Sequence, residues 1–337
     1  MPTHISLRVA PKRLSLVRVP ENRRTETFGE SVRAGLSDAR KTLSCRFLYD
    51  EIGSGLFEQI CDLPEYYLTR AEDAILADHA DAMVEGWLRA PTMIELGSGS
   101  STKTRRLLSA SLEAYDDLHY VPIDVSATIL EASSRAIADD YDRLRVTGYV
   151  GDYRGALGEI AKRIRGPKLI VFLGSSLGNY DHDESVALLR QIASAMKSED
   201  RLLLGTDLAK DKATLEAAYD DAQGVSAAFN LNLLARINRE LDANFRLDSF
   251  RHEARYEAER GRVEMHLVSL ETQDVHIPGA GIRVSFAENE SIHTENSHKY
   301  TIEQLGHLAE SAGLAEESSW TDAEGRFRVQ RWKTTRG

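Results

Sequence analysis

The sequence predicts an α/β protein with a parallel sheet and an inserted α+β unit. From residue 91 to 207, short apolar runs alternate with segments of helical period, which is the pattern of repeated βαβ units. After Asp207 the pattern changes to two long helices and then to segments with period-two alternation, before a last helix and strand pair. The turn Gly97-Ser98-Gly99 follows the first apolar run, at the edge where open α/β sheets bind ligands.

The elements of the first unit follow in chain order. The run 169–173 is apolar throughout, as expected of a central strand buried on both faces, and Ser126 is placed to cap the helix after the second strand. Strands are expected at 92–96, 119–124, 145–152, 169–173 and 201–207, and helices at 102–115, 126–141, 156–164 and 184–196.

The second unit interrupts the first between its fifth strand and its last helix. Its helices carry regularly spaced apolar residues, and its strands alternate apolar with polar residues. Residues 1–40 have no clear period before Phe28, and we expect a partly ordered lead-in there. Helices are expected at 212–222, 228–243 and 301–313, and strands at 254–259, 262–275, 282–288 and as a pair near 315–333.

Composition excludes several classes of protein. The 337-residue chain has a formal net charge of -11, which argues against a nucleic-acid partner because phosphate binding needs a basic surface. No apolar run approaches the roughly 18 residues of a membrane span, and we expect neither a membrane partner nor a secretory signal. Cys45 and Cys61 are too few for a disulfide framework and lack metal-site spacing, so we expect a cytoplasmic protein without a metal.

The glycine turn indicates a nucleotide-type cofactor. Gly97 and Gly99 allow a tight turn and a close approach of the ligand, while the N–H groups of the following helix face it. A dinucleotide fingerprint has a third glycine three residues later, and here that position is Thr102. The sequence therefore argues against a nicotinamide-dependent enzyme, and binding of NADH would be the observation that favours this alternative again.

Acidic residues at strand ends favour S-adenosylmethionine as the cofactor. Glu95 precedes the turn, Asp124 closes the second strand and Asp152 closes the third. An acid after the second strand can accept both ribose hydroxyls, and one after the third can accept from the adenine amine. Each acid alone could equally be a turn or cap residue, but three in register with the βα pattern predict a sulfonium nucleoside without a pyrophosphate.

Segments along most of the chain resemble a known family. The stretch 49–72, YDEIGSGLFEQICDLPEYYLTRAE, is similar to the N-terminal signature of the methyltransferases that form amino-acid betaines, among them the L-histidine Nα-methyltransferases of ergothioneine biosynthesis. The likeness runs from about Arg46 to the C-terminus. Further similar segments lie at 94–105, 171–179, 202–211, 218–232, 263–267 and 293–300.

The resemblance implies a class I, Rossmann-like methyltransferase core with a substrate-binding domain. We place the core at residues 70–208 and 299–337, and the substrate-binding domain at 15–69 and 209–298. Residues 1–14 are expected to form a disordered leader. A monomer that binds a small amino acid is expected.

The resemblance also implies the roles of individual residues. Tyr49 falls near the reacting amine and, with Asn179, is the expected catalytic pair. Tyr66, Asn179 and Tyr219 fall where the family binds the amino-acid head group, and Gly174 and Ser176 lie in the same loop as Asn179. Glu295 and Ser297 fall where the family holds an imidazole, with Met265 beside the ring. The cofactor is expected to contact Glu95, Gly97, Gly99, Lys103, Asp124, Asp152 and Tyr153.

These residue types suit methyl transfer to an amine. Tyrosine hydroxyls and an asparagine amide bind a carboxylate without adding charge, and aromatic faces favour a quaternary ammonium by about 0.5–2 kcal/mol per contact. We therefore expect trimethylation of L-histidine to hercynine. Another amino acid such as tryptophan is the nearest alternative substrate. A non-catalytic sensor of S-adenosylmethionine or an amino acid is the alternative from another class of protein.

Overall fold

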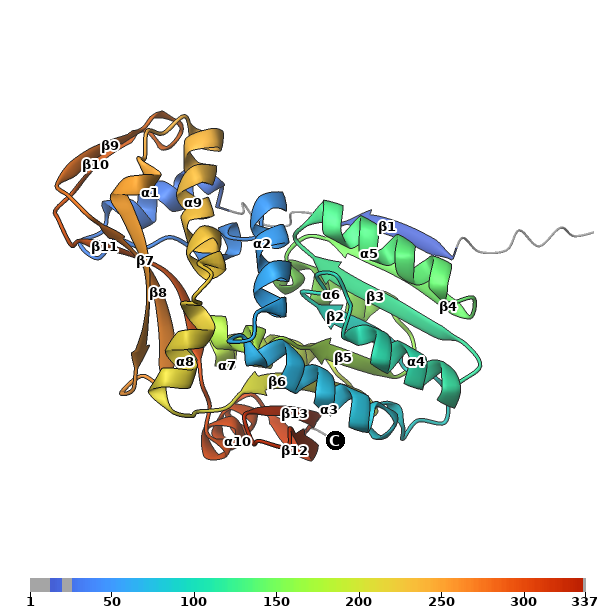
Figure 1. Cartoon of the computed structure of the whole chain (residues 1–337). Coiled ribbons are helices and arrows are strands. Elements are labelled where there is room, and N and C mark those ends of the chain that lie inside the picture. Colours follow the sequence, from blue (N-terminus) through green and yellow to red (C-terminus); the bar gives the residue numbers. More distant parts are fainter. Residues whose placement is uncertain (1–12, 20–25, 336–337) are drawn as a thin grey trace, which may run out of the picture.

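The computed structural model describes residues 13–19 and 26–335. An eight-stranded sheet with helices on both faces makes up one part of the molecule, and a smaller part of helices and antiparallel strands lies beside it (Figure 1). The smaller part contains the segment inserted after the sheet's β6 together with helices from the N-terminal region. The expected α/β class with an inserted α+β unit is confirmed.

The central sheet has the order β1-β4-β3-β2-β5-β6-β13-β12. All neighbours from β1 to β6 are parallel, whereas β13 runs antiparallel to both β6 and β12. The carboxyl ends of the parallel strands therefore share one edge, which faces the smaller part. The strands are β1 (Leu14–Arg18), β2 (Thr92–Leu96), β3 (Leu118–Asp124), β4 (Leu144–Val150), β5 (Lys168–Phe172), β6 (Arg201–Asp207), β12 (Leu314–Thr321) and β13 (Phe327–Thr334).

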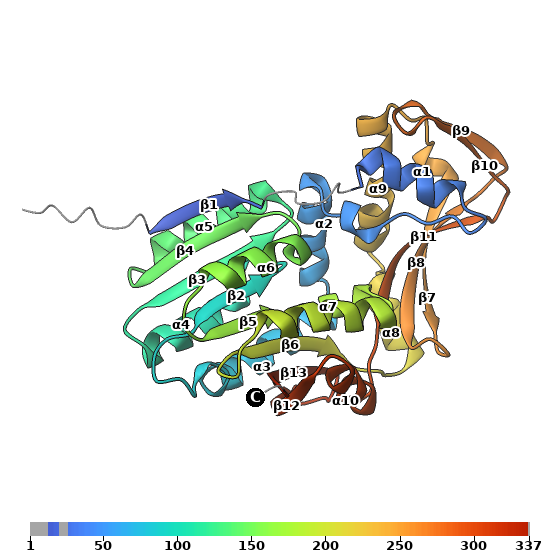
Figure 2. The ribbon, with the colours of Figure 1, turned by 180° about the vertical axis from the view of Figure 1, so that it is seen from behind.

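Alternate residues of each buried strand pack against helices on opposite faces of the sheet. Met93 of β2 belongs to the cluster that includes α3, α4 and α5, whereas its neighbour Ile94 belongs to the cluster that includes α6, α7 and α10. Figure 2 shows the second layer from behind. The helices are α3 (Tyr67–Val84), α4 (Thr104–Ala114), α5 (Ala127–Asp140), α6 (Tyr153–Arg163), α7 (His182–Ala195) and α10 (Ile302–Ser311).

The smaller part is a three-stranded antiparallel sheet of order β11-β8-β7, a hairpin of β9 and β10, and covering helices. Helix α9 packs against both α2 and β7, so the N-terminal and inserted segments form one body. Its elements are α1 (Phe28–Ser37), η1 (Cys45–Phe47), α2 (Glu51–Asp62), α8 (Lys212–Tyr219), α9 (Val225–Leu241), η3 (Leu247–Ser249), β7 (Phe250–Glu257), β8 (Arg262–Ser269), β9 (Gln273–Ile277), η4 (Pro278–Ala280), β10 (Ile282–Phe286) and β11 (Ser291–His298).

Two strand predictions differ from the structure. The expected strand 262–275 is two strands, β8 and β9, because the chain turns at residues 270–272. Strand β11 was not predicted as a strand, since its sequence SIHTENSH is polar almost throughout. Its side chains are nevertheless half-buried or buried, and two of the polar ones, Glu295 and Ser297, line a cavity.

The N-terminal region is more ordered than the sequence predicts. Residues 14–18, expected in the lead-in and in the substrate-binding domain, form the edge strand β1 of the central sheet, where Leu16 packs over Gly148 of β4. A five-residue edge strand pairs on one side only, so its sequence signal is weak. Arg13 and Leu14 are described, and the rest of the expected leader lies outside the described residues. The remaining domain boundaries stay a prediction.

Gly205 in the middle of β6 leaves room for a buried carboxylate from helix α3. A Cβ atom at residue 205 would lie 2.1 Å from Oε1 of Glu72 and 3.2 Å from the Phe327 ring. The side chain of Glu72 is fully buried and cannot retreat into solvent. Close packing at this point therefore depends on the glycine.

We expect Gly205→Ala to lower the free energy of unfolding by about 1–3 kcal/mol, because overpacking forces side chains out of their rotamers. Urea denaturation followed by circular dichroism measures this change. Gly306→Ala in the exposed part of α10 is the matched control, since nothing lies within 4 Å of its added Cβ and alanine favours helix. Equal stability of the two variants would contradict the close packing of Glu72.

Candidate active site

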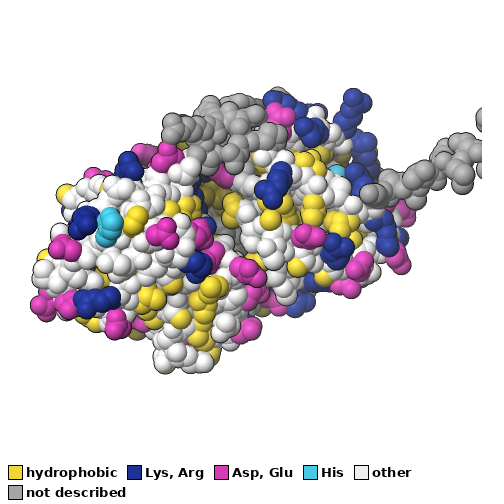
Figure 3. All heavy atoms as spheres, turned by 90° about the horizontal axis from the view of Figure 1, so that it is seen from above, with side chains coloured by type: hydrophobic (Ala, Val, Ile, Leu, Met, Phe, Trp, Pro, Cys, Tyr) yellow, Lys and Arg dark blue, Asp and Glu magenta, His cyan; other side chains and the backbone are white. Residues whose placement is uncertain are grey.

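One large cavity lies between the two parts of the molecule. It has a volume of about 2420 Å³ and opens as a hollow between the two parts (Figure 3). All sixteen residues that the sequence analysis assigned to the site line it. The structure thus brings the expected cofactor and amino-acid ends into a single space, although the role of each residue remains a prediction.

The glycine turn after β2 forms one wall of the cavity. Gly97 and Gly99 have φ angles of +67° and +52°, which side chains rarely adopt, and a Cβ at Gly99 would point into open space. The buried hydroxyl of Ser98 lines the cavity and has no hydrogen-bond partner in the described structure. A turn with an open cradle and an unpaired hydroxyl suits a nucleoside ligand such as S-adenosylmethionine.

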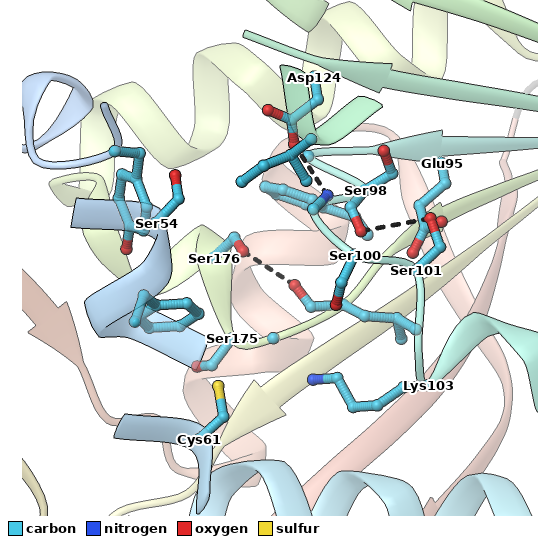
Figure 4. A pocket seen from close by; sticks show the side chains of 18 of the residues that line it. Ser54, Cys61, Glu95, Ser98, Ser100, Ser101, Lys103, Asp124, Ser175 and Ser176 are labelled. Carbon is cyan, nitrogen blue, oxygen red and sulfur yellow. Dashed lines mark hydrogen bonds between the residues drawn. The ribbon is translucent and has the colours of Figure 1, made fainter. Parts of the chain in front are cut away.

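Asp124 stands at the end of β3, beside this turn. Its carboxylate accepts hydrogen bonds from the backbone N–H groups of Gly99 and Ser126, each at 2.8 Å. Burial raises its pKa, while these backbone hydrogen bonds act in the opposite direction. Figure 4 shows Asp124 and Lys103 on opposite sides of the loop that carries Ser98 and Ser100. The Asp124 carboxylate therefore stabilises the turn through these hydrogen bonds, and it also lines the cavity, where a ribose could bind.

Glu95 lies beneath the turn and is almost fully buried. The hydroxyls of Thr104 and Tyr120 each donate to a different oxygen of its carboxylate. Burial raises the pKa of Glu95 to about 7, although the two hydroxyl donors oppose the rise. Because both oxygens already have protein partners, its clearest contribution is to fix β2, β3 and α4 around the turn.

The acid after the third strand also has a structural partner. Asp152 caps helix α6 by accepting a hydrogen bond from the backbone of Arg154 at 2.9 Å. Tyr153 packs edge-on against Phe172, and its hydroxyl lies 2.5 Å from that of Tyr180. Asp152 thus takes the helix-cap role and also lines the cavity, and its contact with an adenine amine stays a prediction.

Glu72 of α3 is a functional candidate that the sequence analysis missed. Its buried carboxylate forms an ion pair with Lys103 and accepts from the backbone N–H of Gly174 at 2.8 Å. It therefore joins an expected cofactor residue to an expected substrate loop. The available signal was an acid flanked by Leu68, Ile75 and Leu76 at helical spacing, because an acid on an apolar face needs a buried partner.

Aromatic side chains form the opposite wall of the cavity. The ring of Tyr49 lies 5.5 Å from the rings of Phe57 and Phe229, and the ring of Tyr66 lies 5.9 Å from that of Tyr219. Burial raises the pKa of both Tyr49 and Tyr66 well above the usual tyrosine range. The hydroxyls therefore remain protonated at neutral pH, and this wall adds no charge. The sequence analysis did not assign Phe229.

Strands β8 and β11 carry the polar end of the same space. Met265 is the direct cross-strand partner of Glu295, so both side chains face the cavity. The register of β11 shifts between His293 and Glu295, and from there the period of two places Ser297 on the same face. Burial raises the pKa of Glu295 to about 8, although nearby Lys299 lowers it.

The loop after β5 joins the two ends of the cavity. Gly174 has a φ of +74°, and the amide of Asn179 donates to Glu295 at 3.3 Å. A Cβ at Gly178 would lie 3.0 Å from the backbone oxygen of His298, so this glycine allows β11 to approach the loop. Ser176 lines the cavity and donates to the carbonyl oxygen of Leu173.

Within the described residues, no group of three or more His, Cys, Asp or Glu side chains is arranged to hold a metal ion. Cys45 and Cys61 are free thiols, and burial raises the pKa of Cys45 to about 12. None of the helices in the described part of the chain is long and apolar enough to cross a membrane.

A family model and two curated relatives indicate the same family for this chain. A family model described as "Histidine-specific methyltransferase, SAM-dependent" matches residues 28–334. The histidine N-alpha-methyltransferase of Mycolicibacterium smegmatis is 41% identical over 302 residues, covering 90% of this chain and 93% of that protein. The protein of the same name from Mycobacterium tuberculosis is 43% identical over 296 residues, covering 88% of this chain and 91% of that protein.

Two more distant similarities complete the comparison. Ergothioneine biosynthesis protein 1 of Neurospora crassa is 32% identical over 289 residues, which are 84% of this chain but 32% of that longer protein. Among solved structures, a magnesium protoporphyrin IX methyltransferase from Synechocystis with bound S-adenosylhomocysteine covers 86% of this chain and 97% of its own. Its sequence identity is 12% and its TM-score 0.45.

The parallel sheet, its glycine turn and the family match together define an S-adenosylmethionine-dependent methyltransferase. More narrowly, the chain belongs to the family of histidine-specific methyltransferases. The expected family and cofactor are thereby confirmed, and the nicotinamide and sensor alternatives are set aside.

We expect Asp124→Ala to weaken S-adenosylmethionine binding by about 10- to 100-fold, because a hydrogen bond to a charged group contributes about 1.5–3 kcal/mol. Calorimetric titration of the cofactor measures this affinity. Glu295→Ala, at the far end of the cavity, is the control and should bind the cofactor as the unmodified protein does. Unchanged cofactor affinity in Asp124→Ala would remove Asp124 from the ribose site.

Proposed function

We propose that this methyltransferase transfers three methyl groups in succession to the α-amine of L-histidine, giving hercynine in ergothioneine biosynthesis. The names of two relatives at 41% and 43% identity support the reaction. The observation that carries the choice of histidine is the buried Glu295 carboxyl on the cavity wall, since an imidazole N–H needs an acceptor there. A hydrocarbon ring would add no hydrogen bond to this carboxyl beyond the one that Asn179 donates to its Oε1.

The pocket suits a neutral amine. A free α-amine is largely protonated at pH 7 and must lose its proton before it can attack. Tyr49 and Tyr66 offer neutral hydroxyls there, because burial raises the pKa of both. These groups can hold and orient the amine without a strong base, and orientation alone can contribute several kcal/mol to the rate.

Bound S-adenosylmethionine supplies an electrophilic methyl group on a sulfonium. In each transfer, the amine lone pair forms the new C–N bond while the electrons of the broken C–S bond stay on sulfur. The first two products must each release a proton before the next transfer, and the third product is a quaternary ammonium with no proton to lose. Asn179 and Tyr219 are proposed to hold the carboxylate, so that the amine stays in line through all three steps.

The aromatic wall suits the product as well as the substrate. Tyr49, Phe57, Tyr66 and Phe229 present ring faces and edges around one region of the cavity. A growing methylammonium gains about 0.5–2 kcal/mol from an aromatic face and needs no hydrogen-bond acceptor. The same wall therefore tolerates the amine as it becomes a permanent cation.

We also propose that the enzyme acts as a monomer in the cytoplasm. Every residue assigned to the site comes from one chain and lines one cavity, which supports the monomer. The two free thiols fit a reducing compartment.

Mass spectrometry of all twenty amino acids, each incubated with the protein and S-adenosylmethionine, tests the substrate. We expect histidine to gain three methyl groups and the other amino acids to gain few or none. Preferred methylation of tryptophan would replace histidine as the substrate but leave the reaction class intact. No methylation of any amino acid would contradict the proposed function.

At pH 9 we expect Glu295→Ala to lower the ratio of kcat/KM for histidine to that for tryptophan by about 10- to 100-fold, because a hydrogen bond to a charged group is lost. The pKa of about 8 gives this ratio a pH dependence in the unmodified enzyme. Below pH 8 the carboxyl is mostly protonated, and above it the carboxylate is the stronger acceptor. The ratio should therefore rise from pH 7 to 9.

Glu295→Gln is the control for this pH profile. Its amide still accepts a hydrogen bond but does not titrate, so the ratio should stay flat over the same range. If both substrates lose activity equally in Glu295→Ala, Glu295 does not recognise the ring.

A further inference from the structure

Lys299 is a fully buried cation directly behind the amino-acid end of the cavity. Its Nζ lies 2.8 Å from Oδ2 of Asp207, 2.8 Å from the hydroxyl of Tyr219 and 2.9 Å from the hydroxyl of Ser297. The side chains of both Lys299 and Asp207 are 0% exposed. Tyr219 and Ser297 line the cavity, whereas Lys299 does not.

Lys299, Asp207, Tyr219 and Ser297 form one hydrogen-bonded cluster, in which the number of donors fixes where each hydroxyl proton can point. The ammonium of Lys299 has three N–H donors, and its three neighbours are the acceptors for them. The hydroxyls of Tyr219 and Ser297 lie 2.7 Å apart, so one donates to the other. Each hydroxyl oxygen thus accepts from Lys299, and a single hydroxyl proton remains free. That proton can only be directed to a group outside the cluster.

Lys299 stays protonated at neutral pH although its side chain is fully buried. Burial by itself lowers the pKa of Lys299, but the Asp207 carboxylate and the Tyr219 hydroxyl more than compensate, so the net pKa is raised. Burial also raises the pKa of Tyr219, with Lys299 acting against the rise, so the phenol keeps its proton. The cluster therefore presents a donor, backed by a positive charge, to the cavity.

We propose that Lys299 is a positioning residue: through its hydrogen bonds to Tyr219 and Ser297, it makes the Tyr219 hydroxyl a hydrogen-bond donor for the carboxylate of the amino-acid substrate. This proposal rests on the proposed function, in which Tyr219 binds that carboxylate. Without Lys299, the free hydroxyl proton could turn away from the cavity, into the space that the ammonium leaves beside Asp207, and lone pairs would then face the cavity. Lone pairs would repel a carboxylate, so Lys299 selects amino acids over amines or amides that lack the anion.

The neighbouring Lys210 provides a matched control. Its Nζ pairs with the other oxygen of Asp207 at 2.6 Å and with the hydroxyl of Tyr67, but no hydrogen bond joins it to Tyr219 or Ser297. Lys210→Met and Lys299→Met therefore each remove one cation from the same aspartate. Only Lys299→Met removes the donors to the cavity hydroxyls.

The test compares kcat/KM for histidine with that for histidinamide, whose carboxylate is replaced by a neutral amide. We expect Lys299→Met to lower the value for histidine at least tenfold, to lower that for histidinamide less than threefold, and to leave cofactor affinity unchanged. Lys210→Met should keep the ratio of the two substrates near that of the unmodified enzyme. Tyr219→Phe should reproduce the histidine-specific loss, and adding Lys299→Met to it should cost little more.

Two outcomes would overturn the role of Lys299: an equal loss for both substrates, or an equal change of the ratio in Lys210→Met. If Lys299→Met alone does not fold, the double variant Lys299→Met with Asp207→Asn removes both charges of the pair, and the same histidine-specific loss is expected. Failure of the unmodified enzyme to methylate histidine would instead contradict the proposed function. The two proposals are thus tested separately.

Discussion

The buried carboxylate of Asp207 is the interaction on which the arrangement of the site depends. It ends β6, and it accepts from Tyr67 of α3 at 2.7 Å, from Lys210 at 2.6 Å and from Lys299 at 2.8 Å. A buried charge costs several kcal/mol unless it is fully paired. The sheet, helix α3 and the segment after β11 therefore meet at this one buried carboxylate, directly behind the cavity residues Tyr219 and Ser297.

The two ends of the cavity are built in different ways. The end proposed for the cofactor comes from consecutive strand–loop–helix units, in which the turn after β2 and Asp124 after β3 are neighbours because parallel strands end at a common edge. The end proposed for the amino acid combines α2, the loop after β5, α8 and β11, which are far apart in sequence. Glu72 connects the two ends through its ion pair with Lys103 and its hydrogen bond from Gly174.

The charges around the amino-acid pocket are placed behind neutral groups. Lys299 acts through Tyr219 and Ser297, and Asp207 is covered by its own donors. Glu295 faces the cavity directly, with a pKa of about 8 because of its burial. A substrate that changes from neutral amine to permanent cation thus meets aromatic faces and hydroxyls, while the charges that organise those hydroxyls stay out of contact.

The sequence by itself determined the α/β core, the glycine turn with Asp124, the cofactor and the family. These depend on local periods and on motifs that lie within one βα unit, so neighbouring residues carry the whole signal. It left β1 and β11 unrecognised as strands, because a short edge strand and a polar strand have little apolar alternation of their own. Only the tertiary structure decided that Glu72, Phe229 and Lys299 belong to the site. Glu72 pairs with Lys103 and with Gly174, 102 positions away, and Lys299 pairs with Tyr219, 80 positions away. The ring of Phe229 lies against that of Tyr49. Burial of an acid or a lysine is tolerable only beside such partners, and they become neighbours only in the folded chain, so the local sequence does not reveal them.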